Sequence, residues 1–197
     1  MQDEERSFTA FAGTRQVVRG QLDVVVRELV GWLVTGDEST LLIFEDGTGR
    51  QVDFDLRGTA DEAVARLASH PIMGGAEGAE RRSGPGRPKL GVVSREVSLL
   101  PRHWEWLEEQ PGGMSATLRR LVDEARRRGA GADRVRRSRE AAGRVMTALA
   151  GDLPGYEEAS RALWAGDGGR LTAMTREWPS DVRAYVERLA EGAEEKD

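Results

Sequence analysis

Apolar residues in the first third of the chain recur at helical spacing in two places. Residues 21–34 carry apolar side chains three and four positions apart, as on one face of a helix, and Gly36 stands where that helix should stop. Thr59, followed three residues later by Glu62, predicts a capping box at the start of a short helix that reaches Ser69. Two amphipathic helices are therefore expected here.

The other apolar runs of this region predict strands. Residues 8–11 form one short run, and residues 40–44 and 51–56 flank the Asp46-Gly47 dipeptide, whose turn chemistry favours a hairpin. In the run 51–56 apolar and charged residues alternate, so one face of that strand should meet solvent. Residues 7–73 are therefore predicted to form a small α+β domain.

The last third of the chain shows only helical patterns. Residues 133–191 are predicted to form a helical domain with helices at 134–149, 156–165, 171–177 and 179–189. Gly- and Pro-containing segments separate these helices. The predicted core consists of Leu163, Trp164, Leu171, Met174, Trp178, Val182, Tyr185, Val186 and Leu189.

A segment rich in Gly, Pro and charge, residues 74–91, has little to bury and predicts a disordered linker. Residues 92–131 then form the predicted central unit. Residues 92–100 predict a strand, and Pro101 begins a helix that should run to Gln110. After Pro111-Gly112-Gly113, Ser115 is predicted to be the N-cap of a second helix with a buried stripe.

The buried stripe of that second helix is predicted to consist of Leu118, Leu121, Val122 and Ala125, and Gly129-Ala130-Gly131 is predicted to end the helix. The expected fold class is therefore α+β. It combines an N-terminal strand-helix-hairpin-helix unit, a central strand-helix-helix and a C-terminal all-helical unit.

Charge is unevenly distributed along this chain of net charge −5. Between Arg81 and Arg144 there are sixteen Arg or Lys residues and eight Asp or Glu residues, which gives a local net charge of +8. The remaining residues carry a net charge of −13. Such segregation is typical of a basic nucleic-acid-binding module between acidic ones. An arginine-rich face on an ordinary soluble protein would give the same count.

The central unit resembles the ribbon-helix-helix class of DNA-binding domains. The residues that carry the resemblance are the Leu100-Pro101 junction, the Gly break and the Ser115 position. A lone short strand lacks partners for its backbone, so the resemblance implies a homodimer whose two strands pair and enter the major groove of DNA. It also implies that the start of the second helix lies against phosphate.

Two registers remain open for the strand, because a shift of one residue reverses every side chain. In the first, Arg95, Val97 and Leu99 face the DNA; in the second, Glu96, Ser98 and Leu100 do so. The helix start would donate N–H groups around Ser115. The full set of predicted DNA contacts is Arg87, Lys89, Arg95, Val97, Ser98, Leu99, Ser115, Ala116, Thr117 and Arg119.

Arg87 and Lys89 belong to Pro85-Gly86-Arg87-Pro88-Lys89, which is similar to the core of an AT-hook. A narrow A·T-rich minor groove attracts an inserted arginine by its negative potential. Farther on, Arg126-Arg127-Arg128 and the arginines of residues 134–139 form a second basic cluster. These arginines suit phosphate contacts, and a solvated helix face is the alternative.

Residues for catalysis are few. The chain has no cysteine and only His70 and His103, which excludes disulfides, thiolate sites and multi-histidine metal sites. Asp46, Asp53 and Asp55 could bring carboxylates together on the hairpin, but alternating Asp residues usually mark the solvent face of a strand. No enzymatic activity and no cofactor are therefore expected.

Three runs give the chain a wider resemblance: residues 45–58, residues 84–101 together with His103-Trp104, and residues 150–159. In these runs the sequence is similar to the DUF2239 family of bacterial proteins. The resemblance covers most of the chain and implies no particular activity.

The sequence thus predicts a dimeric DNA-binding protein, a transcriptional regulator that uses the central unit and the AT-hook-like linker. The absence of a long apolar run and the polar start at Met1-Gln2-Asp3 predict a cytoplasmic protein without membrane contact. The alternative is a protein-interaction module, such as an antitoxin-like adaptor, that binds a protein partner through residues 133–191.

Overall fold

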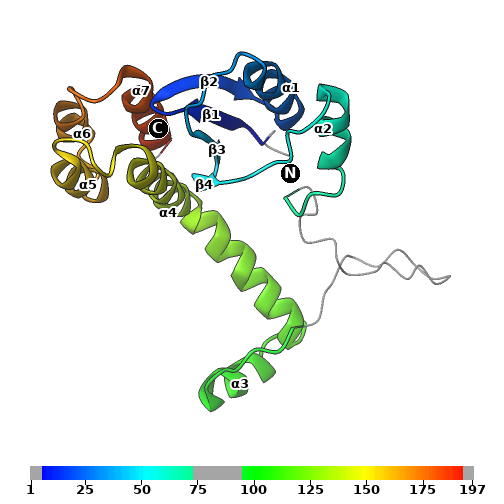
Figure 1. The fold of residues 1–197 in the computed structure, drawn as a ribbon. Helices are drawn as coiled ribbons and strands as arrows, with labels where there is room; N and C mark the ends of the chain where they lie inside the picture. The colour runs from blue at the N-terminus through cyan, green and yellow to red at the C-terminus, as the bar shows by residue number, and fades with distance from the viewer. Residues whose placement is uncertain (1–5, 73–94, 193–197) are drawn as a thin grey trace. The chain divides into compact units, whose positions relative to one another are not determined.

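The computed structural model describes residues 6–72 and 95–192, which form four strands and seven helices (Figure 1). The elements are β1 (Phe8–Ala12), β2 (Arg15–Gly20), α1 (Leu22–Leu33), β3 (Leu41–Glu45), β4 (Arg50–Gln51), α2 (Ala60–Leu67), α3 (Pro101–Glu108), α4 (Met114–Ala150), α5 (Tyr156–Ala165), α6 (Gly168–Met174) and α7 (Ser180–Glu191). The predicted α+β fold class is confirmed.

The chain divides into two compact units. The first unit consists of Met1–Gly75 together with Gly131–Asp197, and the second unit is Ala76–Ala130. Helix α4 contributes residues to both. No helix in the described part of the chain is long and apolar enough to cross a membrane.

The first unit is built on a four-stranded antiparallel sheet with the strand order β2-β1-β3-β4. All five residues of β1 are buried, because helices cover both faces of the sheet. Side chains alternate between the faces, as strand geometry requires. Phe8 and Ala10 enter one apolar cluster, whereas Phe11 enters the other.

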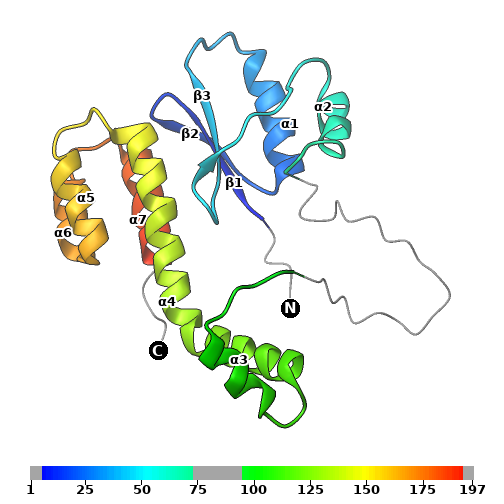
Figure 2. The ribbon, with the colours of Figure 1, turned by 90° about the horizontal axis from the view of Figure 1, so that it is seen from below.

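The face that carries Phe8 packs against α1 and α2 (Figure 2). Helix α1 contributes Val25, Val26 and Leu29, whose spacing puts them on one side of the helix. Helix α2 begins with the predicted capping box: the Thr59 side chain accepts from the Glu62 N–H, and Glu62 accepts from the Thr59 N–H. Both predicted helices of this region are confirmed.

The opposite face of the sheet packs against the C-terminal helices. Phe11 and Phe44 meet the Tyr185 ring of α7 at centroid distances of 5.3 and 6.2 Å. Val145 and Met146 of α4 belong to the same cluster. The predicted separation of residues 7–73 and 133–191 into two domains thus differs from the structure, in which they share one core.

Most of the predicted C-terminal elements agree with the structure. Helix α5 has the predicted bounds, and α6 and α7 lie within a few residues of the predicted positions. Trp178 is buried and donates its Nε1–H to the Pro154 carbonyl at 2.9 Å. Trp164, predicted to be in the core, is instead 53% exposed.

Two predicted strand boundaries differ from the structure. Strand β2 directly follows Gly13 and pairs with β1, although no separate strand was predicted there. The run 51–56 is a strand only at Arg50–Gln51, although the Val52 N–H still donates to the Ile43 carbonyl at 2.8 Å. The predicted alternation of half-buried and exposed side chains does hold along this run.

The largest correction concerns α4. Gly129-Ala130-Gly131 does not end a helix; α4 runs without interruption over 37 residues, so the predicted helix 134–149 is its second part. A helical glycine costs only about 1 kcal/mol relative to alanine. Ion pairs one helical turn apart, Arg128–Glu124 at 2.5 Å and Arg136–Glu140 at 3.4 Å, favour the continuous helix on both sides of the glycines.

Candidate nucleic-acid interface

The described residues of the second unit comprise an irregular segment, 95–100, then α3 and the first part of α4. Pro101 is the first residue of α3, as predicted, and Gly112 and Gly113 adopt positive φ angles of 91° and 83° in the turn after it. The helix-turn-helix part of the predicted central unit is therefore present.

Residues 95–100 form no strand with any described part of the chain. This differs from the predicted strand, whose first residues, 92–94, lie outside the described residues. Arg95, Val97 and Ser98 are exposed and Leu99 is half-buried. Both Val97 (58%) and Leu100 (49%) expose apolar surface, so neither strand register is favoured within one chain.

The start of α4 requires two corrections. The helix begins at Met114, and Gly113 accepts the first helical hydrogen bond, from Thr117 at 3.1 Å. Ser115 therefore lies in the first turn and is not the N-cap. Thr117 is buried (3% exposed) and has used its N–H, which removes it from the predicted phosphate donors.

Ser115 and Ala116 are better placed than Thr117 for the predicted role, the donation of backbone N–H groups to DNA phosphate. Both are exposed, and the first N–H groups of a helix have no acceptor within it. They lie at the positive end of the helix dipole, where an anion is stabilised. The free N–H groups at this end of α4 can donate hydrogen bonds to a phosphate oxygen.

One side of the first part of α4 carries exposed arginines. Arg119 and Arg126 are seven residues apart, as are Arg120 and Arg127, so the four side chains lie within about a third of the helix circumference. Among the described residues, Arg119 bonds only to the backbone carbonyl of Ser115, at 3.1 Å. No carboxylate of the described residues forms an ion pair with any of the four.

We name these four residues the arginine face: Arg119, Arg120, Arg126 and Arg127. The neighbouring Arg128 points to a different side of α4 and is bonded to Glu124 at 2.5 Å. Of the arginine face, Arg119 was predicted as a DNA contact, and Arg126 and Arg127 as part of a basic cluster. Arg120 was missed, although its seven-residue spacing to Arg127 could have revealed it.

The second unit has little interior of its own. Among its described residues only Leu107 (2% exposed) and Thr117 are buried. The predicted buried stripe of α4 is only partly correct, since Leu118 and Leu121 are half-buried whereas Val122 and Ala125 are exposed. Exposed apolar side chains of this unit are Val97, Leu100, Trp106, Met114 and Val122.

The AT-hook-like run with Arg87 and Lys89 lies outside the described residues, as does the whole predicted linker, residues 74–91. The predicted contacts that can be placed are therefore those of residues 95–99 and of the start of α4. His103 is exposed on α3.

Asp46 is the clearest case in which the prediction was wrong. It was predicted to lie on the solvent-exposed face of the hairpin. Its side chain is instead only 10% exposed and accepts four hydrogen bonds in the first unit. The donors are Ser7 and Thr9 at 2.7 Å and Arg19 and Tyr185 at 2.9 Å. Thr9 lies in β1, Arg19 in β2 and Tyr185 in α7, and Ser7 directly precedes β1.

Burial raises the pKa of the Asp46 carboxyl, but the hydrogen bonds from Thr9, Ser7, Arg19 and Tyr185 outweigh it and hold the pKa below its usual value. Burial, and after it the contact with the Asp46 charge, raises the pKa of Tyr185. With four donors among the described residues, Asp46 joins β1, β2 and α7 as a buried structural anion.

The other hairpin carboxylates are not gathered around it. Asp55 is bonded on the surface to the Arg57 side chain at 2.8 Å, which lowers the pKa of Asp55. Within residues 6–72 and 95–192 no group of three His, Asp or Glu side chains is arranged to hold a metal ion.

A family described as an uncharacterized protein conserved in bacteria, DUF2239, matches residues 7–190. The chain belongs to the DUF2239 family. The match covers the polar centre at Asp46, the arginine face and all the described helices and strands except the end of α7. Comparisons with curated proteins and with solved structures each found no match.

The DUF2239 match confirms the resemblance seen in the three sequence runs. The family description names no ligand and no reaction. The resemblance of the central unit to ribbon-helix-helix domains stays a prediction, because that fold is completed only when two chains pair.

Proposed function

We propose that this DUF2239 protein is a DNA-binding protein, a transcriptional regulator that acts as a dimer through its second unit. The observation that carries the proposal is the arginine face, four exposed arginines without carboxylate partners among the described residues, on the helix whose N-terminus offers free N–H groups. Arginine binds phosphate oxygens in a bidentate manner, and a helix N-terminus adds directional donors.

The dimer is part of the proposal because the second unit lacks a sufficient interior. Residues 95–130, the described part of this unit, bury only two residues, which is too little apolar surface for a segment of this size to be stable alone. Its exposed apolar residues, together with a segment 95–100 that has no strand partner in the described chain, suit a second copy of the same unit. Pairing of two such segments would form the expected ribbon.

The test is a fluorescence-anisotropy titration of the full chain with a mixture of labelled genomic DNA fragments at several salt concentrations. Arg120→Ala/Arg126→Ala/Arg127→Ala should weaken binding and lower the slope of log K against log salt by about 1 for each arginine that bound a phosphate in the wild type. The control Arg161→Ala/Arg170→Ala/Arg176→Ala removes the same charge from exposed positions of the first unit and should bind as the wild type does.

Two outcomes contradict the proposal: no binding even at low salt, or equal losses of affinity in the two triple variants. Adding Arg87→Ala/Lys89→Ala to the experiment measures what the AT-hook-like run contributes.

The dimer has a test of its own. Val97→Asp places a charge in the exposed apolar surface of the second unit and should convert the dimer into a monomer in sedimentation analysis. Val34→Asp is the control, because Val34 is 82% exposed in the first unit. A wild-type chain that is monomeric at micromolar concentration would contradict the proposed dimer.

A second candidate function rests on Trp164, a large apolar side chain of α5 that is 53% exposed. We propose as the alternative a protein-interaction module, antitoxin-like or adaptor-like, that binds a protein partner through the C-terminal helices. If DNA binding is absent and a protein partner is retained by the wild type but not by Trp164→Ala, this alternative replaces the first proposal.

A further inference from the structure

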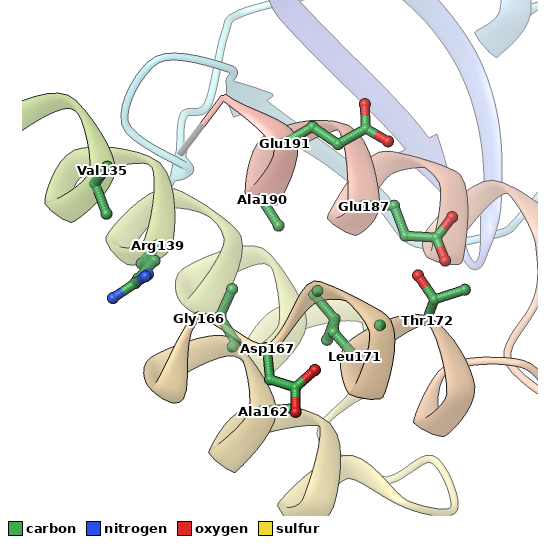
Figure 3. A pocket seen from close by; sticks show the side chains of 13 residues that line it. Val135, Arg139, Ala162, Gly166, Asp167, Leu171, Thr172, Glu187, Ala190 and Glu191 are labelled. Atoms are coloured by element: carbon green, nitrogen blue, oxygen red, sulfur yellow. The ribbon is translucent and has the colours of Figure 1, made fainter. Parts of the chain in front are cut away.

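A cavity of about 730 Å³ lies in the first unit among α4, α5, α6 and α7 (Figure 3). This volume is within the range of small-molecule sites, roughly 300–1,000 Å³. Leu163, Leu171 and Ala190 supply much of its apolar lining. Its charged lining residues are three acids and one base: Asp167, Glu187, Glu191 and Arg139.

Glu187 is the unusual member of this lining. Its Oε1 atom is buried and has no hydrogen-bond partner among the described residues. Figure 3 shows the carboxylate directed from α7 toward α6, on the side of Thr172, whereas Glu191 points away from that helix. A buried carboxylate oxygen without a donor is unfavourable, and a ligand with an N–H group can supply that donor.

The other charged groups of the cavity are positioned by the fold. Asp167 caps α6, with its Oδ1 atom accepting from the Arg170 N–H at 2.9 Å. The Arg139 guanidinium lies against Gly166, so closely that any Cβ at that position would collide with it. The positive φ of Gly166, 75°, also requires glycine. Arg139 thus lies next to the C-terminal end of α5, and Glu187 lies on α7.

We propose that this cavity binds a small organic cation, a primary ammonium or guanidinium compound, whose N–H group donates to Glu187 Oε1. The acids outnumber the single arginine, which favours a cation over an anion. A metal ion does not fit, because the described carboxylates do not converge into a group that could hold one. The apolar lining suits a short hydrocarbon chain on the same molecule.

The probes are n-butylammonium and n-butylguanidinium chloride, titrated into the ¹⁵N-labelled full-length protein and followed by NMR. Sodium butyrate, with the opposite charge on the same chain, and sodium chloride are the reference titrations. The amide signals of residues 166–172 and 187–191 should shift and reach saturation with the cations only. Shifts that do not saturate, or that butyrate reproduces, overturn the proposal.

Glu187→Gln keeps the shape of the side chain and removes its charge. It should weaken binding of the cations by about tenfold or more, because the acceptor of the cation's hydrogen bond loses its negative charge. Glu177→Gln, at an exposed position that does not line the cavity, is the matched control and should change binding by less than about twofold. Equal affinities in the wild type and Glu187→Gln overturn the assignment.

Ala190→Leu provides a second variant that leaves every charge in place and fills the cavity. It should also weaken the cations, and unchanged affinity would contradict binding in this cavity. The site lies entirely in the first unit, so failure of this proposal and failure of DNA binding by the second unit are seen in separate experiments.

Discussion

The two units of this protein bury apolar residues to very different extents. In the first unit β1 is buried along its whole length and separate clusters cover the two faces of the sheet. In the second unit the described residues bury only Leu107 and Thr117 and expose Val97, Trp106 and Val122. The first unit completes its core within one chain, whereas the second is suited to a partner.

Several arginines show the same contrast between the two units. In the first unit Arg19 bonds Asp46, Arg144 bonds the Thr48 carbonyl at 2.5 Å, and Arg188 lies over the Tyr185 ring at 4.9 Å. In the second unit the arginine face has no such acid or ring partner among the described residues. Arginines that hold a fold together and arginines available to bind a ligand can thus be distinguished by their contacts.

The largest expected difference in stability between the two units comes from truncating one aromatic side chain in each. Phe11→Ala removes a fully buried ring between Phe44 and Tyr185, so the free energy of unfolding should fall by about 3–5 kcal/mol. Trp106→Ala, at a side chain that is 46% exposed, should change it by less than about 1 kcal/mol at low concentration. Urea denaturation measures both, and similar losses of stability would contradict the contrast.

A smaller effect is expected at the turn between β3 and β4. Gly49 has a φ of 63°, and a Cβ there would collide with the backbone of Ala141 in α4. Gly49→Ala should lower the free energy of unfolding by about 2–4 kcal/mol, from the collision and the backbone strain together. Gly47→Ala is the control two residues away, since a Cβ at Gly47 meets nothing within 4 Å. Thermal unfolding should separate the two variants by several degrees.

The smallest of these effects depends on pH. The pKa of Asp46 is lower in the folded protein than its model-peptide value of 3.8. Asp46 therefore adds stability above that unfolded value, and this contribution is lost as pH falls through the lower folded pKa. Asp46→Asn should cost about 1.5–3 kcal/mol at pH 7 and progressively less at acid pH. Urea titrations from pH 7 to pH 2 test this; parallel pH profiles would contradict it.

Elements with a local signal could be predicted from the sequence. The Thr59–Glu62 capping box, the helix at residues 22–33 and helix α5 each have spacing or cap residues that act within a few positions. Strand β2 was missed because its two adjacent valines, Val17 and Val18, do not alternate with polar residues. Its formation depends on pairing with β1.

Features that depend on distant residues could not be predicted. Gly129 and Gly131 resemble a helix stop, and no local pattern shows that α4 continues through them. In the sequence Asp46 resembles a solvent-facing turn residue. Its burial could not be predicted from its neighbours, because one of its donors, Tyr185, is 139 positions away. The arginine face could be counted in the sequence, but only the structure shows which arginines have no carboxylate partner within the described residues.

The contact between Asp46 and Tyr185 also sets an order for folding during synthesis. The sheet can pack on α1 and α2 early, since all these elements lie within the first 67 residues. Its other face is completed only when α7 has been made: Tyr185 lies 139 residues after Asp46, which at roughly 5–20 residues per second takes about 7–28 s. Until then Phe11 and Phe44 lack the Tyr185 ring that packs against them in the folded protein.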